Sequence, residues 1–439
     1  MTLNIDVAEV ESFDSLPKSP TVADVDAEFW KSRESLTAIR DYALACMVSP
    51  WGFLGAVIAY TVAAVPYWCA LPGIADDDEP GSLNLFVGLV ARSGGSKGRI
   101  VKAARRYVGR ADLDLPPGSG EGLVKLFVRR DASKPSDDHR PSDVFTVGGD
   151  RYAWTRRAVL LNVPEIDTLD ALMRRSSSTL PSLLRQGFSG ETLGFGYADD
   201  TKRAFVPGGE YRLTMLVGVQ PTRSGALFDD ADGGTPQRFL FLPTEDSQVS
   251  RHNRPAKPAP IDPNVFAGEW PHEFTIPACA TEEIEIAAEA RARGEGDALD
   301  GHRLFVRAKV AAALAVLDGR RWMTEDDWRL SAVVMAVGDR TRAVCVAALG
   351  EAAQAANVAR GRSDGMRSVI ADETAHTERM RRVAATLTRA VAKHGPTPRG
   401  KVQSLVSSRY RDVWADALDL AIERGDLVES DGVVSVSSP

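Results

Sequence analysis

The chain has few of the residues that build covalent or metal-bound frameworks. It contains 4 cysteines and 6 histidines among 439 residues, and no two of them stand at the spacing of a zinc site. Cys46, Cys69, Cys279 and Cys345 lie far apart, so the sequence does not indicate a disulfide framework. We therefore expect a reducing compartment, the cytoplasm, and a fold that depends on its hydrophobic cores.

Signals for secretion and for membrane insertion are also missing. The first 15 residues are acidic and contain no Lys or Arg, whereas a signal peptide begins with basic residues. An uncharged stretch of 34 residues, 42–75, is interrupted by Pro50, Pro66 and Pro72. Its longest uninterrupted piece, 51–65, has 15 residues, and a spanning helix needs about 20. We expect a buried helix here and no membrane contact.

Composition and charge describe an ordinary globular protein of several domains. Hydrophobic residues make up 44% of the chain and charged residues 26%, which excludes a largely disordered or fibrous protein. The net charge of −7 argues against a generally basic nucleic-acid coat, although a local basic face can still bind phosphates. The length predicts more than one domain.

Local patterns divide the chain into five segments. We expect an acidic leader with a helical N-terminal domain (1–80), an α/β core (81–250), a proline-rich linker (251–280), a helical domain (281–380) and a winged helix (381–439). Short apolar runs in the core, at 83–87, 158–161, 213–217 and 239–242, are typical of buried parallel strands. The final segment indicates three helices followed by a hairpin that turns at Asp431 and Gly432.

The main chemical signal is a strand, a small-residue turn and a helix between residues 84 and 100. Such a turn presents backbone N–H groups and a helix N-terminus to phosphates. The residues that would bind ATP there are Ser93, Gly94, Gly95, Ser96, Lys97 and Gly98. Compared with the P-loop pattern G-x-x-x-x-G-K-[ST], Ala91 and Ser96 replace the glycines, and Gly98 replaces the hydroxyl residue that ligates Mg²⁺. The alternative is a flexible glycine turn before a basic helix.

Several ordered blocks make the resemblance more specific. They read SLNLFVGLV at 82–90, SG at 93–94, KG at 97–98, GSGEG at 118–122, VPEIDTL at 163–169, GTPQRFL at 234–240, KVAAAL at 309–314 and EDDW at 325–328. Together they resemble a family of actinobacterial and phage helicase-like ATPases over about residues 30–350. In that family, ATPase units with a RecA-like core are associated with primase-polymerase domains in mobile elements.

The resemblance implies a fold, cofactors and partners. It implies an α/β, RecA-like P-loop ATPase core with helical N-terminal and C-terminal parts, and the pattern of the final segment adds a C-terminal winged helix. The implied cofactors are ATP and Mg²⁺. The implied partners are DNA in single-stranded form, further copies of the chain in a ring, with a hexamer favoured, and a primase or another replication protein.

Two carboxylate regions are candidates for the hydrolytic chemistry. Glu121 lies 24 residues after Lys97, about where RecA-like ATPases carry the general base, although it could also be a solvated loop residue. Glu165 and Asp167 follow the run 158–161 and resemble a Walker B region that holds Mg²⁺ through water. Asn162 occupies the simple strand-end position, so the choice between these two carboxylates stays open, and both could instead cap the next helix.

Two further residues have roles implied by the resemblance. Gln220 follows the run 213–217 and matches the polar sensor of the γ-phosphate, or alternatively faces solvent at a strand end. Arg238 precedes the run 239–242 and matches an arginine finger that acts on a neighbouring subunit's ATP, with an exposed turn arginine as the alternative. Arg223 is a weaker candidate for the same role.

The last segment bears on DNA binding. Residues 381–411 contain eight basic residues and no acidic residue, a composition that suits phosphate binding. The expected third helix carries Asp412, Asp416, Asp419 and Glu423, which oppose entry into the major groove. We therefore expect backbone contacts by the first two helices, or protein docking.

Two functions remain open from the sequence. The first is a ring-forming replication motor of a phage or plasmid that acts on DNA through ATP hydrolysis. The second is a non-hydrolysing relative that binds DNA or a replication partner as a scaffold or loader. The blocks with Glu121 and Arg238 favour the first, whereas Ala91, Ser96 and Gly98 favour the second.

Overall fold

A computed structural model describes most of the chain. The described residues are 22–73, 79–92, 94–131, 143–197, 203–229, 234–252, 254–266, 272–295 and 302–437. The leader up to residue 21 and Ser93 of the turn lie outside these ranges. The chain forms two compact units, Met1–Gly350 and Glu351–Pro439.

A five-stranded, all-parallel sheet forms the centre of the first unit, which confirms the predicted α/β core. Its spatial order is β11 (Phe239–Pro243), β2 (Leu85–Val90), β10 (Arg212–Val219), β7 (Ala158–Val163) and β3 (Asp114–Leu115). β2 and β10 are buried along their whole length, as expected for apolar runs covered on both faces. Within this sheet, β10 therefore separates β2 from β7.

Three helices precede the sheet: α1 (Val22–Lys31), α2 (Glu34–Ala45) and α3 (Pro50–Ala64). The Ser49 side chain caps α3 by accepting the Gly52 N–H, and Pro50 suits the first helical turn. Nearly all of α3 is buried, which confirms the predicted buried helix. Within the described ranges, no single helix is long and apolar enough to span a membrane. Only α2 and α3 together, with a 117° bend between them, have the required length and composition.

The remaining helices of this unit flank the sheet or connect its strands. They are α4 (Lys97–Val108), α5 (Gly120–Phe127), α6 (Ile166–Met173), α7 (Leu180–Ser189), α8 (Gly225–Phe228), α9 (Ala278–Ala292) and α10 (Arg303–Leu317). Lys309 of α10 is buried against the sheet, where its Nζ donates to the carbonyls of Asn84 and Phe188 at 2.6 and 2.8 Å. Phe266, Phe274 and Ala280 join the same core, so the expected linker segment packs onto this unit.

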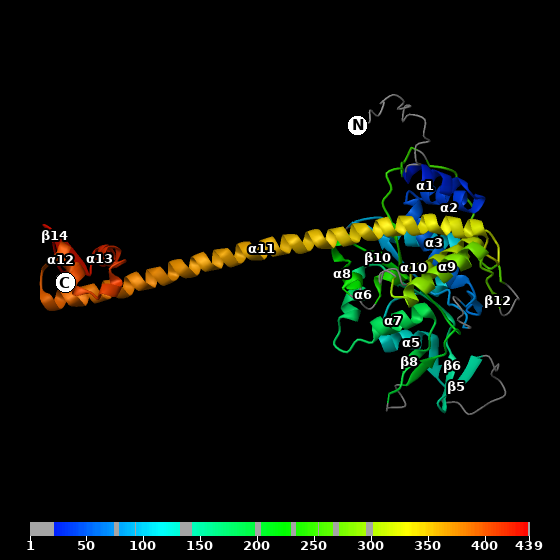
Figure 1. The fold of residues 1–439 in the computed structure, drawn as a ribbon, viewed down its shortest axis with the longest axis horizontal. Coiled ribbons are helices and arrows are strands. Elements are labelled where there is room, and N and C mark those ends of the chain that lie inside the picture. The colour runs from blue at the N-terminus through cyan, green and yellow to red at the C-terminus, as the bar shows by residue number, and fades with distance from the viewer. Residues whose placement is uncertain are drawn as a thin grey trace, which may run out of the picture. The chain divides into compact units, whose positions relative to one another are not determined.

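Three small sheets complete the first unit. They are antiparallel β4 (Val128–Arg130), β6 (Asp150–Trp154) and β5 (Val144–Val147); antiparallel β8 (Leu193–Phe195) and β9 (Ala204–Val206); and parallel β1 (Cys69–Ala70) and β12 (His272–Glu273). Figure 1 shows α1 and α2 at one end of this unit and β5 and β6 at the other. The sequence did not predict these sheets because their strands are short and only partly buried.

The second unit packs around the end of a long helix. α11 (Glu325–His394) has 70 residues and passes from the first unit into the second. It is followed by β13 (Thr397–Pro398), α12 (Arg399–Val402), α13 (Trp414–Glu423), β14 (Leu427–Ser430) and β15 (Val433–Val436). Asp431 and Gly432 both have positive φ, 49° and 72°, as a two-residue hairpin turn requires. This confirms the predicted hairpin.

Candidate functional site

The turn after β2 has the shape of an anion-binding loop. Gly94 has a φ of 79°, and a Cβ on Gly95 would lie 2.5 Å from the Cβ of Ala91, so the tight turn requires glycine there. α4 begins directly after this turn at Lys97. The first N–H groups of a helix have no acceptor within it, and the helix dipole adds positive potential at the same place. An anion is therefore favoured at this point.

Lys97 is buried and directed toward the neighbouring strands. Only 6% of its surface is exposed, and its Nζ lies 3.0 Å from Oε2 of Glu165, which directly precedes α6 after the end of β7. The Lys97 side chain passes over Gly218 of β10, where an added Cβ would lie 3.2 Å from Lys97 Cδ and 2.0 Å from the Pro164 carbonyl oxygen. Glycine at position 218 therefore gives the lysine its path to the carboxylate.

Gln220, which follows a third strand, donates a hydrogen bond to the same carboxylate. It follows the end of β10, and its Nε2 donates to Oε2 of Glu165 at 3.1 Å. Lys97, Glu165 and Gln220, all predicted from the sequence, are thus brought together at the carboxyl edge of the sheet. We call these three side chains the Lys97 cluster.

Asp167 lies in the first turn of α6 and is not hydrogen-bonded to this cluster. Its Oδ2 lies 3.0 Å from Nη1 of Arg223, and both side chains are at least half exposed. An acidic residue at this position also suits the helix dipole. Of the two Walker B candidates, Glu165 is therefore the one that faces Lys97.

Glu121 makes its hydrogen bonds outside the Lys97 cluster. It lies in the first turn of α5, behind the cap formed by Ser119, and its Oε1 accepts the Tyr197 hydroxyl at 2.7 Å. This hydrogen bond is the main reason that the pKa of Glu121 lies below its usual value. Within the described residues, its hydrogen bonds do not reach Lys97 or Glu165, so its role as general base stays a prediction.

Arg238 lies at the end of the sheet where the strands begin, opposite the Lys97 cluster. Phe239 pairs with Phe86 at the start of β2, whereas Lys97 follows the end of that strand. β2 has six residues, and the five steps between them, at about 3.3 Å each, separate the two ends of the strands by roughly 17 Å. Arg238 is half-buried, and its Nη1 donates to the Gly234 carbonyl at 2.7 Å. Arg238 therefore lies on the opposite side of the sheet from Lys97.

Asp114, which could not be singled out from the sequence, organises the sheet edge next to β7. Asp114 accepts the Tyr60 hydroxyl at 2.6 Å and the Asn162 amide at 3.4 Å, and it forms an ion pair with Arg105. Asn162, found where a simple count would place the Walker B carboxylate, is therefore held by Asp114. β3 has only two residues and gave no apolar run that could have revealed it.

The site suits a phosphate-bound Mg²⁺ better than a metal held by the protein alone. No group of three or more His, Cys, Asp or Glu side chains among the described residues could hold a metal ion. Mg²⁺ is commonly held by phosphates, waters and one or two carboxylates. Oε1 of Glu165 accepts no hydrogen bond from the described residues, and the Glu165 side chain is 49% exposed, so it can bind a metal-coordinated water.

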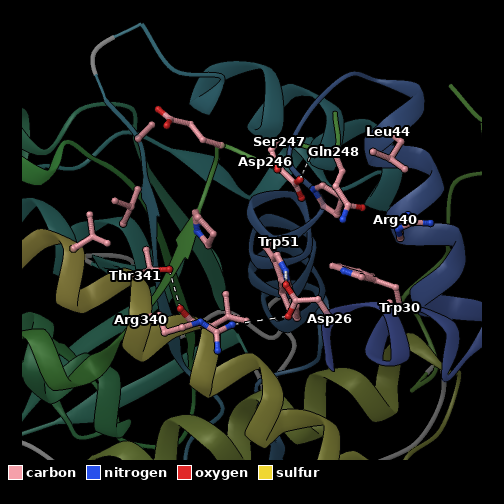
Figure 2. A pocket seen from close by; sticks show the side chains of 18 of the residues that line it. Asp26, Trp30, Arg40, Leu44, Trp51, Asp246, Ser247, Gln248, Arg340 and Thr341 are labelled. Atoms are coloured by element: carbon pink, nitrogen blue, oxygen red, sulfur yellow. Dashed lines mark hydrogen bonds and ion pairs between the residues drawn. The ribbon is translucent and has the colours of Figure 1, made fainter. Parts of the chain in front are cut away.

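A cavity of about 820 Å³ adjoins the start of the turn after β2. Its walls come from α1, α2, α3 and α11, from Val90, Ala91 and Arg92 of the turn, and from the segment after β11. Figure 2 shows Trp51 and Asp26 between Arg340 and Thr341 on one side and Trp30 and Arg40 on the other. The sequence analysis did not identify this cavity, because its walls are far apart along the chain.

Comparison with known proteins adds no assignment. No protein-family model matches the chain, and no curated protein matches it either. Function is therefore inferred from the Lys97 cluster, the cavity beside it and the topology of the sheet.

Proposed function

We propose that the chain is an ATPase with a RecA-like core that binds Mg²⁺-ATP at the turn 94–98 and drives a ring-shaped motor on DNA during phage or plasmid replication. The observation that supports this best is the convergence of Lys97 and Gln220 on one oxygen of Glu165, at 3.0 and 3.1 Å. These three residues come from three separate strand ends, as the pattern of phosphate lysine, Walker B carboxylate and sensor requires.

The topology supports the same proposal. Numbered along the chain, the strands of the parallel sheet stand in the order 5-1-4-3-2. In RecA-like cores, an additional strand likewise separates the P-loop strand from the Walker B strand. Here β10 takes that place and ends at Gln220. Ligands of open α/β sheets bind at the carboxyl ends of the strands, where the Lys97 cluster lies.

The side chains of the cluster suit phosphoryl transfer to water. The Lys97 ammonium would leave Glu165 and contact the β- and γ-phosphate oxygens, where a buried cation stabilises developing negative charge. The released Glu165 carboxylate would orient water, and the Gln220 amide would contact the γ-phosphate. Mg²⁺, when bound with ATP, supplies further charge neutralisation to the phosphates.

The second unit supports a role on DNA through its arrangement of charge. Its helices and hairpin fit a winged helix, and several acidic residues of this unit are neutralised internally. Arg399 pairs with Asp419 and Glu429, and Arg379 pairs with Asp412. Arg381, Arg389 and Lys393 on the last turns of α11 are exposed and suit contacts with the phosphate backbone. A primase or another replication protein is the expected partner.

Measurement of ATP hydrolysis with and without single-stranded DNA tests the proposal. We expect Mg²⁺-dependent hydrolysis that single-stranded DNA stimulates and that Lys97→Ala abolishes. Absence of ATP binding to the wild-type protein would refute the proposed function.

A non-hydrolysing scaffold or loader of the same fold is the second candidate. It is favoured by Gly98, which offers no side-chain oxygen to Mg²⁺ at the position where a P-loop carries Ser or Thr. Tight ATP binding with no hydrolysis, in the presence or absence of DNA, would select this function over the motor.

A further inference from the structure

The cavity beside the phosphate turn has the character of a ligand site. Its volume, about 820 Å³, lies within the range of about 300–1,000 Å³ that is typical of small-molecule sites. Trp30 and Trp51 line it, with ring centroids 4.8 Å apart, together with Leu44 and, from α11, Val337 and Val344. Flat rings and aliphatic side chains of this kind favour an aromatic ligand.

The cavity adjoins the start of the turn that leads to α4. Val90, Ala91 and Arg92 form part of its wall, and the same turn leads into α4 at Lys97. A nucleotide with its phosphates at Lys97 would therefore have this apolar cavity next to its sugar and base. Pro221, one residue after Gln220, lines the cavity from the β10 side.

Asp26 places an unsatisfied acceptor in the wall of this cavity. Its Oδ2 accepts the Trp51 indole N–H at 3.3 Å. Its Oδ1 is buried and accepts no hydrogen bond from the described residues, and Nη2 of Arg340 lies 3.9 Å from it. Figure 2 shows Arg340 directed toward this carboxylate. Desolvation raises the pKa of Asp26 above its usual value, which reflects the same lack of solvent. A ligand N–H would satisfy this oxygen.

We propose that this cavity binds the adenine base of the nucleotide, with the 6-amino group donating to Asp26 Oδ1 and the Arg340 guanidinium donating to a ring nitrogen. This inference rests on the proposed function, because it assumes that the phosphates lie at Lys97. It goes further by assigning base selectivity to Asp26.

The donor and acceptor pattern explains why adenine fits this pair. Adenine presents an N–H donor at position 6 next to the acceptor nitrogen N7, which matches a carboxylate beside a guanidinium. Hypoxanthine, the base of ITP, carries an oxygen at position 6 and a proton on N1 but keeps N7 as an acceptor. That oxygen would face the Asp26 carboxylate without a proton between them, so ITP should bind more weakly.

The test compares ATP, ITP and inorganic tripolyphosphate by titration calorimetry with the wild-type protein and Asp26→Asn. We expect the wild type to bind ATP about 10- to 100-fold more tightly than ITP, because one hydrogen bond to a charged group gives an affinity difference of this size. Asp26→Asn should remove most of this preference and leave tripolyphosphate binding unchanged. Equal affinity of the wild type for ATP and ITP, or a preference that persists in Asp26→Asn, would overturn the inference.

A matched pair on α11 tests the position of the base without changing a buried group. Val344 is 57% exposed and lines the cavity, whereas Val346 is 53% exposed and does not. Val344→Trp should weaken ATP binding at least about tenfold by filling the cavity mouth, and Val346→Trp should not. Equal ATP affinities in the two variants would contradict the inference.

The same titrations separate this inference from the proposed function. If Lys97→Ala loses ATP binding while Asp26→Asn and Val344→Trp do not, ATP binds at the turn and its base lies elsewhere. If the wild type binds neither ATP nor tripolyphosphate, the proposed function fails, and the assignment of the cavity fails with it.

Discussion

Nζ of Lys97 lies 3.0 Å from Oε2 of Glu165, although 68 residues separate them in the chain. Lys97 starts α4 and Glu165 directly precedes α6, so the pair joins two loops at the carboxyl edge of the sheet. The lysine is almost fully buried while the carboxylate is half exposed. A phosphate that enters from solvent can therefore replace the carboxylate as the partner of Lys97.

The first prediction concerns this lysine. Lys97→Ala should abolish ATP binding and leave the fold intact, because the surrounding sheet is held by apolar packing. Titration calorimetry measures the binding, and circular dichroism checks the fold. Wild-type affinity for ATP in the variant would show that Lys97 does not contact the phosphates.

The second prediction compares the two candidate carboxylates. The low pKa of Glu121, caused mainly by the Tyr197 hydroxyl, makes it a weak base, whereas Glu165 faces Lys97 directly. Glu165→Gln should keep ATP binding and lower turnover by about 10²–10⁴, the usual contribution of an acid–base group. Glu121→Gln should do the same only if Glu121 is the general base. Steady-state hydrolysis by the two variants decides between them, and unchanged turnover in Glu165→Gln would remove it from the reaction.

The sheet and part of the site could be predicted because they depend on local patterns. Buried parallel strands are continuous apolar runs, and four of the five strands were found in this way. Lys97, Glu165 and Gln220 follow such runs, and parallel strands bring their carboxyl ends to one edge. Asp26 and Arg340 could not be found, because only the packing of α11 against the first helices brings them together.

The third prediction concerns position 98, where this chain has glycine instead of a residue with a hydroxyl oxygen. A Cβ on Gly98 would have no neighbour within 4 Å, so a serine fits there without displacing other atoms. Gly98→Ser should strengthen Mg²⁺-dependent ATP binding and raise turnover several-fold, because the hydroxyl can ligate the metal. Gly98→Ala is the control, since it adds bulk without oxygen. Identical Mg²⁺ dependence in the two variants would argue against a metal at this position.

The fourth prediction concerns stability at acidic pH. Burial, followed by the positive charges of Arg238, Lys309 and Arg291, lowers the pKa of His302 from 6.5 to about 4. The unfolded chain therefore takes up a proton at this residue more readily than the folded chain between these two values. The contribution of neutral His302 is complete above about pH 6.5 and is lost as the pH falls toward 4.

Thermal unfolding at pH 7.5 and pH 5 measures this effect. The melting temperature of the wild type should fall by a few degrees more than that of His302→Gln, which cannot take up a proton. The difference between the falls of the two proteins cancels the other groups that titrate over the same range. An equal fall in both proteins would show that His302 does not contribute.

The last prediction is that Arg238 acts on the ATP of a neighbouring subunit. Arg238 precedes β11 at the edge where the strands begin, and the Lys97 cluster lies where they end. The width of the sheet, roughly 17 Å along six residues of β2, is too large for a guanidinium to cross. In a ring, the strand-start edge of one subunit can face the strand-end edge of the next. A guanidinium supplied in this way stabilises the transition-state charge.

Arg238→Ala should then bind ATP normally, assemble normally and fail to hydrolyse. Lys97→Ala should also fail to hydrolyse ATP, because it keeps Arg238 but lacks the phosphate contact. Mixing the two inactive proteins places an intact Lys97 site next to an intact Arg238 at some interfaces, so part of the hydrolysis should return. An inactive mixture, or a wild-type protein that stays monomeric with ATP and DNA at micromolar concentration, would favour the scaffold over the ring-shaped motor.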